Sequence, residues 1–177
     1  MIFTDTPLDG AKVIELEPAR DQRGWFARTF DADLFRERGL HPAIVQCSTS
    51  FNERTGTLRG MHYQEEPHGE PKLVRCTRGA VFDVIVDLRP ESQTYCGWFG
   101  IELAPDGGKM VYIPSGFAHG FQTLVDASEV HYQMGYEYVP EAALGVRWDD
   151  PAIGITWPAT EERIISERDR GFPDFVP

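Results

Sequence analysis

Apolar and polar residues alternate along this chain over short windows, whereas apolar residues seldom repeat at helical spacing. The clearest case is the segment AVFDVIVDL, in which Phe82, Val84 and Val86 fall on one side and Asp83 and Asp87 on the other. Such a pattern is typical of a strand. Its length and apolar content predict a central strand of a β-sandwich or barrel.

Similar runs recur every 10 to 15 residues or so and are separated by clusters rich in Gly, Pro, Asp and Ser. This spacing favours antiparallel strands over strand-helix-strand units. The expected strands are Ala11–Leu16, His41–Cys47, Lys72–Arg78, Ala80–Leu88, Trp98–Leu103, Lys109–Ile113, Gly120–Leu124 and Val130–Tyr138.

Helical signals occur at only two places. Asp31 can cap a short helix that runs through Phe35 and Arg38, and Gly39 is placed to end it. A second short helix is expected at Ala159–Ser166. The sequence therefore predicts an all-β fold with a few short peripheral helices.

Composition supports one globular domain that spans residues 1–177. The chain has 177 residues, of which 41% are hydrophobic and 25% charged, so a disordered or fibrous protein is excluded. The 17 glycines and 13 prolines, with 11 Phe, 6 Tyr and 4 Trp, fit many strands joined by turns.

Charge and cysteine content narrow the function classes. A net charge of −11 disfavours binding to nucleic acid or anionic lipid over a broad surface, although it allows a local basic pocket. Cys47, Cys76 and Cys96 form no CxxC pair, so reduced thiols and a cytoplasmic location are expected. No basic leader and no apolar run of membrane-spanning length is found, which argues against secretion and membrane insertion.

Two of the five histidines lie in distinctive surroundings. His62 belongs to TLRGMHYQ, where strict alternation on a strand separates two sets of three residues. His119 belongs to IPSGFAHGF, a turn that leads into an apolar strand. The set expected to share a face with His62 is Leu58 and Gly60, and the opposite set is Arg59, Met61 and Tyr63.

The spacing of Pro114, Gly116 and His119 is that of the second half of the cupin metal motif. The first half usually supplies two more histidines and a glutamate, whereas here His62 is followed by Tyr63 and Gln64. A catalytic divalent ion usually needs about three protein ligands. We therefore expect no metal site.

Cations cluster around the same segments. If their strands are adjacent, Arg59, Lys72 and Arg75 would surround a barrel mouth with a histidine and aromatics, which suits an anionic ligand such as a diphosphate. Arg78 is expected to be a surface residue.

Seven blocks of sequence together resemble the dTDP-4-dehydrorhamnose 3,5-epimerase family, in the order found there, from about residue 13 to 170. They are DQRGWF, TLRGMHYQ, PKLVRCTRGAVFDVIVDLR, IPSGFAHGF, the Tyr132 strand, VRWDDPAIGITWP and SERD. The resemblance implies a metal-independent cupin jelly roll, without a cofactor, that works as a homodimer. One subunit's N-terminal strand would extend the other's sheet.

The reaction that the resemblance implies is epimerisation of a nucleotide-linked 4-keto-6-deoxyhexose at C3 and C5. Matched by motif, His62 would be the base, Asp169 its carboxylate partner, and Tyr132 the acid on the other face of the sugar. Lys72 would stabilise the enolate at the C4 oxygen. The implied substrate-binding residues are Arg23, Phe26, Gln46, Ser48, Arg59, His119, Tyr138 and Arg168.

Three of the binding positions depart from the family's pattern. Arg28 stands where Glu is usual, Ser48 where Asn is usual, and Ala143 where an acidic residue is usual. A guanidinium in place of a carboxylate changes which base edge or phosphate can be bound. The nucleotide, the sugar and the number of inverted centres, C3 alone or both, therefore stay open.

Other functions are also compatible with a jelly roll of this composition. A 3,4-ketoisomerase of the same sugars, a metal-dependent cupin enzyme and a sugar-nucleotide binding module without turnover are the alternatives. An acid and a base together are not required for binding alone, so their pairing favours an epimerase.

Overall fold

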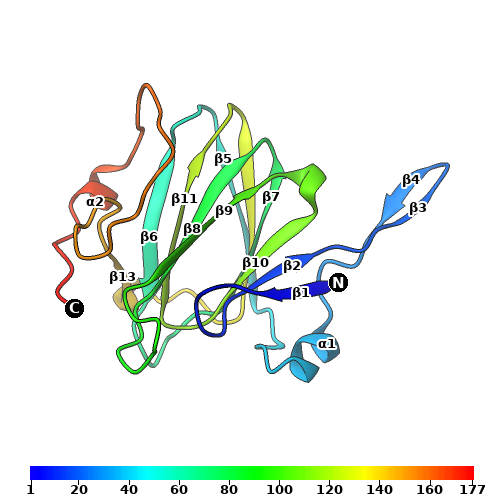
Figure 1. Ribbon diagram of the computed structural model, residues 1–177, viewed down its shortest axis with the longest axis horizontal. Coiled ribbons are helices and arrows are strands. Elements are labelled where there is room, and N and C mark those ends of the chain that lie inside the picture. The colour runs from blue at the N-terminus through cyan, green and yellow to red at the C-terminus, as the bar shows by residue number, and fades with distance from the viewer.

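The computed structural model describes residues 1–177, and its body consists of two antiparallel sheets packed face to face (Figure 1). One sheet has six strands in the order β1-β2-β10-β7-β12-β5, and the other has five in the order β13-β6-β11-β8-β9. Strands β3 and β4 form a separate hairpin. This arrangement is a jelly roll, as the family resemblance implies, and it agrees with the sandwich or barrel that the alternation of apolar residues predicts.

Every element is short. The strands are β1 (Ile2–Asp5), β2 (Lys12–Glu15), β3 (Ala19–Asp21), β4 (Gly24–Phe26), β5 (Gln46–Asn52), β6 (Leu58–Gln64), β7 (Lys72–Arg78), β8 (Val81–Asp87), β9 (Trp98–Leu103), β10 (Lys109–Ile113), β11 (Phe117–Thr123), β12 (Ser128–Met134) and β13 (Ala143–Gly145). The helices are α1 (Ala32–Glu37), α2 (Glu167–Arg170) and the 3₁₀ helices η1 (Pro105–Gly107) and η2 (Pro140–Ala142).

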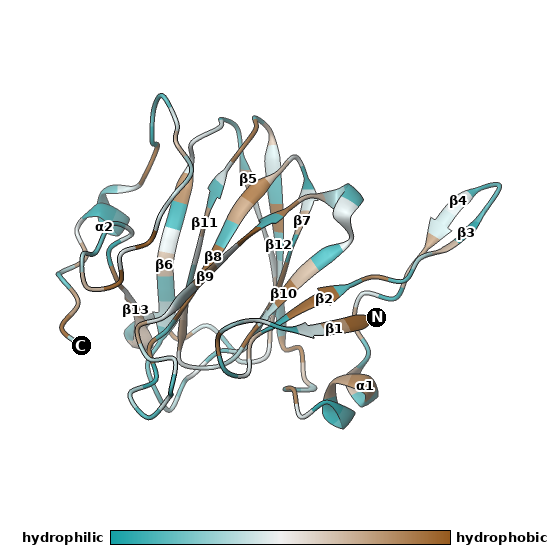
Figure 2. Ribbon diagram, in the orientation of Figure 1, coloured by the Kyte–Doolittle hydropathy of each residue, from teal (hydrophilic) through white to brown (hydrophobic).

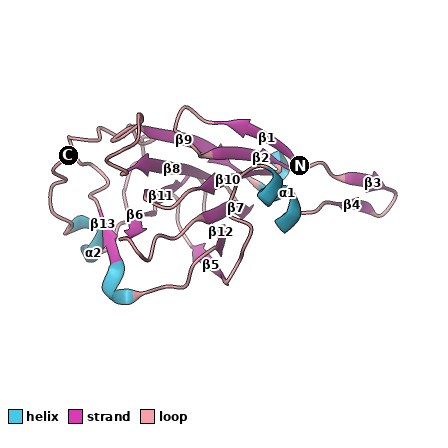
Figure 3. Cartoon of the chain, turned by 90° about the horizontal axis from the view of Figure 1, so that it is seen from below, coloured by secondary structure: helices cyan, strands magenta, loops and turns pink.

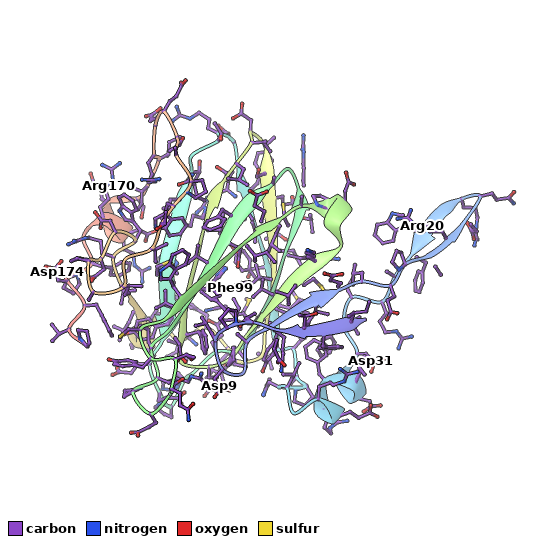
Figure 4. All side chains as sticks on the ribbon, in the orientation of Figure 1. Asp9, Arg20, Asp31, Phe99, Arg170 and Asp174 are labelled. Carbon is purple, nitrogen blue, oxygen red and sulfur yellow. The ribbon has the colours of Figure 1, made fainter.

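The main core lies between the two sheets, where alternate residues of facing strands meet. Val74 of β7, Ile85 of β8 and Phe121 of β11 are fully buried in it, and Phe99 packs against it (Figure 4). The strands accordingly alternate between hydrophobic and hydrophilic colours in Figure 2. This core fixes the direction in which the interior-facing side chains of both sheets point.

Both outer faces of the sandwich are partly covered. Phe35 of α1 packs on Ile14 and Tyr112, on the outer face of the six-stranded sheet. The C-terminal segment covers the five-stranded sheet, where Trp157 contacts the cluster around Val84. Helices are therefore confined to the periphery (Figure 3), and no helix is long and apolar enough to cross a membrane.

Helix α1 begins and ends where the sequence predicts. The Asp31 carboxylate accepts hydrogen bonds from the amides of Asp33 and Leu34, which leaves fewer unpaired donors in the first turn. Gly39 follows the helix with a φ of 71°, a left-handed conformation that glycine adopts without strain.

Two predicted elements are wrong. The strand predicted at His41–Cys47 begins only at Gln46, because Pro42 lacks an amide N–H and the backbone N–H of His41 donates to the Tyr112 hydroxyl. Residues Ala159–Ser166 are not a helix, because the backbone of Ile164 pairs with Gly56 and Leu58. Helix α2 starts only at Glu167.

The β3–β4 hairpin projects away from the body of the molecule, on the side opposite α2 (Figure 1). Arg20 of the hairpin and Arg170 of α2 mark these two ends in Figure 4. The predicted DQRGWF turn lies at the hairpin's tip, where Asp21 pairs with Gly24.

Candidate active site

A cavity of about 560 Å³ opens at one end of the sandwich. Its walls come from β5, β6, β7, β11 and β12, from α2 and from the segment that leads into α2. The polar residues that line it are Ser50, Thr57, Arg59, His62, Lys72, His119, Tyr132, Ser166, Arg168 and Asp169.

An irregularity in β6 places two functional residues on the same wall. Arg59 pairs with Phe121 and His62 pairs with His119. Between these two pairs β6 contains one residue more than β11, which is a β-bulge. Gly60 sits in this bulge with a φ of 134°, and a Cβ there would lie 2.5 Å from the Cα of Gly120. The strict alternation predicted from the sequence, with Arg59 opposite to His62, is therefore wrong: both line the cavity.

His62 is held by a buried carboxylate. Its Nε2 lies 2.8 Å from Oδ1 of Asp169, whose side chain is only 6% exposed, whereas the imidazole is 44% exposed. The ring edge also faces Phe172, with centroids 6.0 Å apart. An imidazole fixed at one nitrogen keeps the other free for a ligand, which is the arrangement of a general base.

The backbone holds Asp169 in turn. Oδ2 of Asp169 accepts the amide of Gly60 at 3.1 Å, and its own amide donates to the Ser166 hydroxyl, which caps α2. Burial alone would raise the pKa of the Asp169 carboxyl, but the hydrogen bonds from His62 and Gly60 outweigh it and hold that pKa below its ordinary value. The carboxylate is thus charged at neutral pH and stabilises an imidazolium.

Tyr132 projects from β12 into the same cavity, with its hydroxyl 3.1 Å from the Ser50 hydroxyl. Burial raises the pKa of the Tyr132 phenol well above its ordinary value, and the hydrogen bond to Ser50 opposes this only in part. The phenol consequently keeps its proton at neutral and mildly alkaline pH.

A second imidazole lies between the first and the phenol. His119 is the cross-strand neighbour of His62, and its ring meets that of Tyr132 edge to face at 6.0 Å. Its Nε2 is 2.8 Å from Oδ2 of Asp83, and both side chains are almost fully buried. His119 is therefore a cavity residue, as implied by its motif, but one with little freedom to move.

Two of the three predicted cations reach the cavity. The Nε of Arg59 donates to Oδ1 of Asn52 at 2.7 Å, which orients the guanidinium, and the ammonium of Lys72 pairs with Glu70 at 3.0 Å. The expectation that Arg75 joins them is wrong. Because Lys72 and Val74 face inward, Arg75 points to the outer face of the sheet, opposite His131.

Three comparisons with known proteins bear on this site. The family model described as dTDP-4-dehydrorhamnose 3,5-epimerase matches residues 5–176. An enzyme of that name from Methanothermobacter thermautotrophicus is 47% identical over 173 residues, which cover 96% of this chain and 92% of that protein. The chain belongs to the dTDP-4-dehydrorhamnose 3,5-epimerase family.

Solved structures agree with this assignment. The crystal structure of an enzyme of the same name from Elizabethkingia anophelis is 36% identical, with a TM-score of 0.95, covering 99% of this chain and 96% of that one. A 3'-monoepimerase from Streptomyces bikiniensis, in complex with dTDP-quinovose, is 32% identical, with a TM-score of 0.88 and coverages of 96% and 85%. The protein is accordingly an epimerase, and hence an isomerase, that acts on sugar nucleotides.

A smaller hollow of about 100 Å³ adjoins the cavity and contains several positions at which the sequence resemblance implies substrate binding. Tyr138, Ala143 and Arg168 line it together with His62 and Lys72. Tyr138 is 53% exposed, so its ring face is accessible to a flat ligand. Ala143 leaves the hollow without the carboxylate that is usual at that position.

Gln46 and Ser48 lie on the edge strand β5, beside this hollow rather than in its lining. The Gln46 side-chain oxygen accepts the backbone amide of Tyr138 at 2.9 Å and so fixes the segment that carries that ring. Ser48 is exposed and is the register partner of Tyr132. Neither residue lines the main cavity.

Arg23 and Phe26 are not brought to the cavity of their own chain. Both lie in the β3–β4 hairpin, where Arg23 pairs with Asp21 and the Phe26 side chain is 75% exposed. Arg28, the departure from the epimerase pattern, forms an ion pair with Asp31 at 2.7 Å. These residues can serve a site only if they reach one on another chain.

Four residues that form hydrogen bonds or ion pairs with the cavity side chains were not predicted from the sequence: Ser50, Asn52, Glu70 and Asp83. The sequence places Asp83 on the face opposite Phe82, Val84 and Val86, but both faces of β8 are buried, so the Asp83 carboxylate is buried as well. Ser50 and Asn52 lie on β5 and meet partners on β12 and β6, whereas Glu70 pairs with Lys72 two residues later.

No group of three or more His, Cys, Asp or Glu side chains is arranged to hold a metal ion. The two imidazoles that line the cavity each pair with one carboxylate instead. The absence of a metal requirement stays a prediction.

Proposed function

We propose that this protein inverts C3 and C5 of a nucleotide-linked 4-keto-6-deoxyhexose through an enolate, with His62 as base and Tyr132 as acid. The observation that carries the proposal is that a carboxylate-supported imidazole and a buried, protonated phenol line one cavity together with a lysine. A base and an acid on different walls can act on opposite faces of one carbon.

The first step is removal of a proton next to the ketone. The C4 carbonyl acidifies the C–H bonds at C3 and C5, because the electron pair left behind delocalises onto the carbonyl oxygen. His62 takes the proton and becomes an imidazolium, whose charge the Asp169 carboxylate stabilises at 2.8 Å. Lys72 lines the cavity, so its ammonium can stabilise the negative charge that develops on the C4 oxygen of the enolate.

The second step returns a proton from the other side. Tyr132 donates its phenolic proton to the carbon, the enolate collapses to the ketone, and the configuration is inverted. The phenolate then regains a proton from solvent, and His62 releases its proton to solvent. The balance is one proton lost and one gained at each inverted carbon.

Binding would involve the positive groups around the cavity. In this proposal Arg59 and Arg168 hold the diphosphate, His119 contacts the sugar, and Tyr138 stacks on the base; the support is that all four line the cavity or the hollow beside it. We further propose a homodimer in which Arg23 and Phe26 of a second copy complete the nucleotide end, because the hairpin that carries them has no contact with its own cavity.

Solvent deuterium tests the proposal directly. The intact protein, incubated in D₂O with a nucleotide-linked 4-keto-6-deoxyglucose, should introduce deuterium at C3 and C5. The rate should fall about 10²-fold to 10⁴-fold in His62→Ala, the usual effect of losing a general base. An unchanged rate of deuterium exchange in His62→Ala would show that His62 is not the base.

A substrate panel defines what the departures at Arg28, Ser48 and Ala143 mean. TDP-, UDP-, GDP- and CDP-linked forms of the keto sugar are compared by the rate of deuterium uptake, and the product is analysed by NMR. Uptake at C3 alone identifies a monoepimerase, whereas movement of the carbonyl from C4 to C3 identifies a ketoisomerase and contradicts the proposal.

A further inference from the structure

Lys72 does not stand alone at the cavity wall. Its ammonium lies 3.0 Å from a carboxylate oxygen of Glu70, and the two side chains are only 11% and 8% exposed. Pro71 separates them and is itself buried, which restricts the backbone between the two charges. Nothing in the catalytic scheme above uses Glu70.

The geometry gives the two residues different surroundings. Lys72 lines both the main cavity and the smaller hollow beside it, whereas Glu70 lines only the smaller hollow. The carboxylate therefore holds the ammonium from the side away from the main cavity. Of the three N–H donors of the ammonium, one can point at Glu70 while the others stay available to a ligand.

An ion pair with this little exposure differs from the surface pairs of the same chain. Exposed pairs contribute little, because solvent screens them and both long side chains lose freedom. A lysine has four rotatable side-chain bonds, and an untethered one would spread its charge over many positions. Catalysis by an oriented charge loses much of its effect when the charge is displaced by about 1 Å.

We propose that Glu70 is a positioning residue, which holds the Lys72 ammonium where it meets the developing enolate oxygen. This inference rests on the proposed function of Lys72. It implies that Glu70 acts only through Lys72, so its removal lowers the rate of the chemical step and leaves nucleotide binding in place.

Steady-state kinetics of Glu70→Ala, Glu70→Gln and Lys72→Met test the inference. Glu70→Ala should lower kcat about 10-fold to 100-fold with little change in KM. Glu70→Gln keeps an oxygen that accepts from the ammonium, so it should recover most of that loss. In the Lys72→Met background, Glu70→Ala should have no further effect, because the two residues act as one unit.

Controls separate this role from a structural one. Glu162→Ala removes an exposed carboxylate that pairs with Arg54 at 3.5 Å, and it should leave kcat and the melting temperature unchanged. If Glu70→Ala does not fold, Glu70→Asp shortens the reach by one methylene and should lower kcat severalfold, again only when Lys72 is present.

The inference is overturned by wild-type kcat in both Glu70→Ala and Glu70→Asp, or by an equal fall in the Lys72→Met background. Failure of the proposed function looks different. In that case the wild-type protein itself introduces no deuterium at C3 or C5 of any sugar nucleotide in the panel.

Discussion

Two ionisable side chains of this cavity have opposite roles because their surroundings differ. Asp169 is buried, yet hydrogen bonds from His62 and Gly60 hold its carboxyl pKa below the ordinary value. Tyr132 is buried with a single hydroxyl partner, Ser50, and its phenol pKa is raised. Hydrogen bonds thus keep Asp169 charged despite its burial, whereas burial keeps the Tyr132 phenol protonated.

Replacing Tyr132 by Phe separates proton removal from inversion. The ring still packs against His119, so we expect a folded protein in which His62 still exchanges the substrate proton with D₂O. Inversion should fall about 10²-fold to 10⁴-fold, because no acid serves the other face. NMR of the product reports both quantities, and a wild-type yield of inverted sugar would contradict the assignment.

Asp169→Asn tests the support of the base. An amide at this position can present N–H to Nε2 of His62 and favour the wrong tautomer. We expect kcat to fall about 10²-fold or more, while a binding measurement with the nucleoside diphosphate changes little. A variant as active as wild type would show that the carboxylate is not needed to orient the imidazole.

At the scale of single residues, the sequence predicts the proposed catalytic side chains better than the residues that form hydrogen bonds or ion pairs with them. His62, Lys72, Tyr132 and Asp169 sit in dense motifs, and all four reach one cavity. Ser50 and Asn52 meet Tyr132 and Arg59 on other strands, and Glu70 meets Lys72 across Pro71. Pair contacts of this kind depend on register, which alternation of apolar residues does not specify at the level of single side chains.

Among the elements, the connection from β8 to β9 is held by one buried carboxylate. Asp87 accepts from Nε of Arg89 at 2.8 Å and from the Thr94 hydroxyl at 2.7 Å. Burial alone would raise the pKa of Asp87, but hydrogen bonds from Arg89, Ser92 and Thr94 lower it from the ordinary value of 3.8 to about 2. The anion stabilises the folded state in which these donors converge.

Asp87→Asn should therefore destabilise the protein by about 2 kcal/mol at pH 7, since it removes the buried carboxylate whose pKa the folded state lowers from 3.8 to about 2. The folded-state pKa lies below the unfolded one, so the carboxylate's contribution is full above pH 3.8 and is lost as the pH falls through about 2. Urea unfolding at several pH values should show the two proteins converging in acid. A gap that stays constant down to pH 2 would contradict this account.

The sequence predicts the presence of a strand or helix more often than it predicts the residue at which that element begins. Strands β7, β9 and β10 match their predicted bounds, because a simple two-residue period with turn residues at both ends defines them. The bulge of β6 could not be predicted, since Gly60 adopts its conformation only against the backbone of Gly120. Likewise, the segment at 159–166 pairs with residues about 100 positions earlier, which overrides its local helical pattern.

For the whole molecule, the unexplained feature is the hairpin. Trp25 and Phe26 are 57% and 75% exposed, although side chains of this kind usually find apolar contacts. The hairpin extends from the body in Figure 1 and contacts little of its own chain. The sequence alone indicates a turn at this place but not what the turn contacts, because the partner that we propose for it is a second copy of the chain.

Complementation between variants tests that destination. In the proposed dimer, each cavity combines His62 of one chain with Arg23 and Phe26 of the other. A chain carrying His62→Ala and a chain carrying Arg23→Ala and Phe26→Ala are each expected to be nearly inactive alone. In a mixed dimer, however, the second chain's cavity keeps His62 and receives the intact hairpin of the first, so one of the two sites is wild type.

Co-expression with two affinity tags isolates that mixed dimer, which should recover roughly half of the wild-type rate per dimer. The matched control pairs His62→Ala with Tyr132→Phe. Both substitutions lie in the body of the chain, so neither cavity of that mixed dimer is intact and no rate returns. Equal recovery in the two mixtures, or none in the first, means that the hairpin does not complete the cavity of a second copy, and the position of Arg23 and Phe26 then needs another explanation.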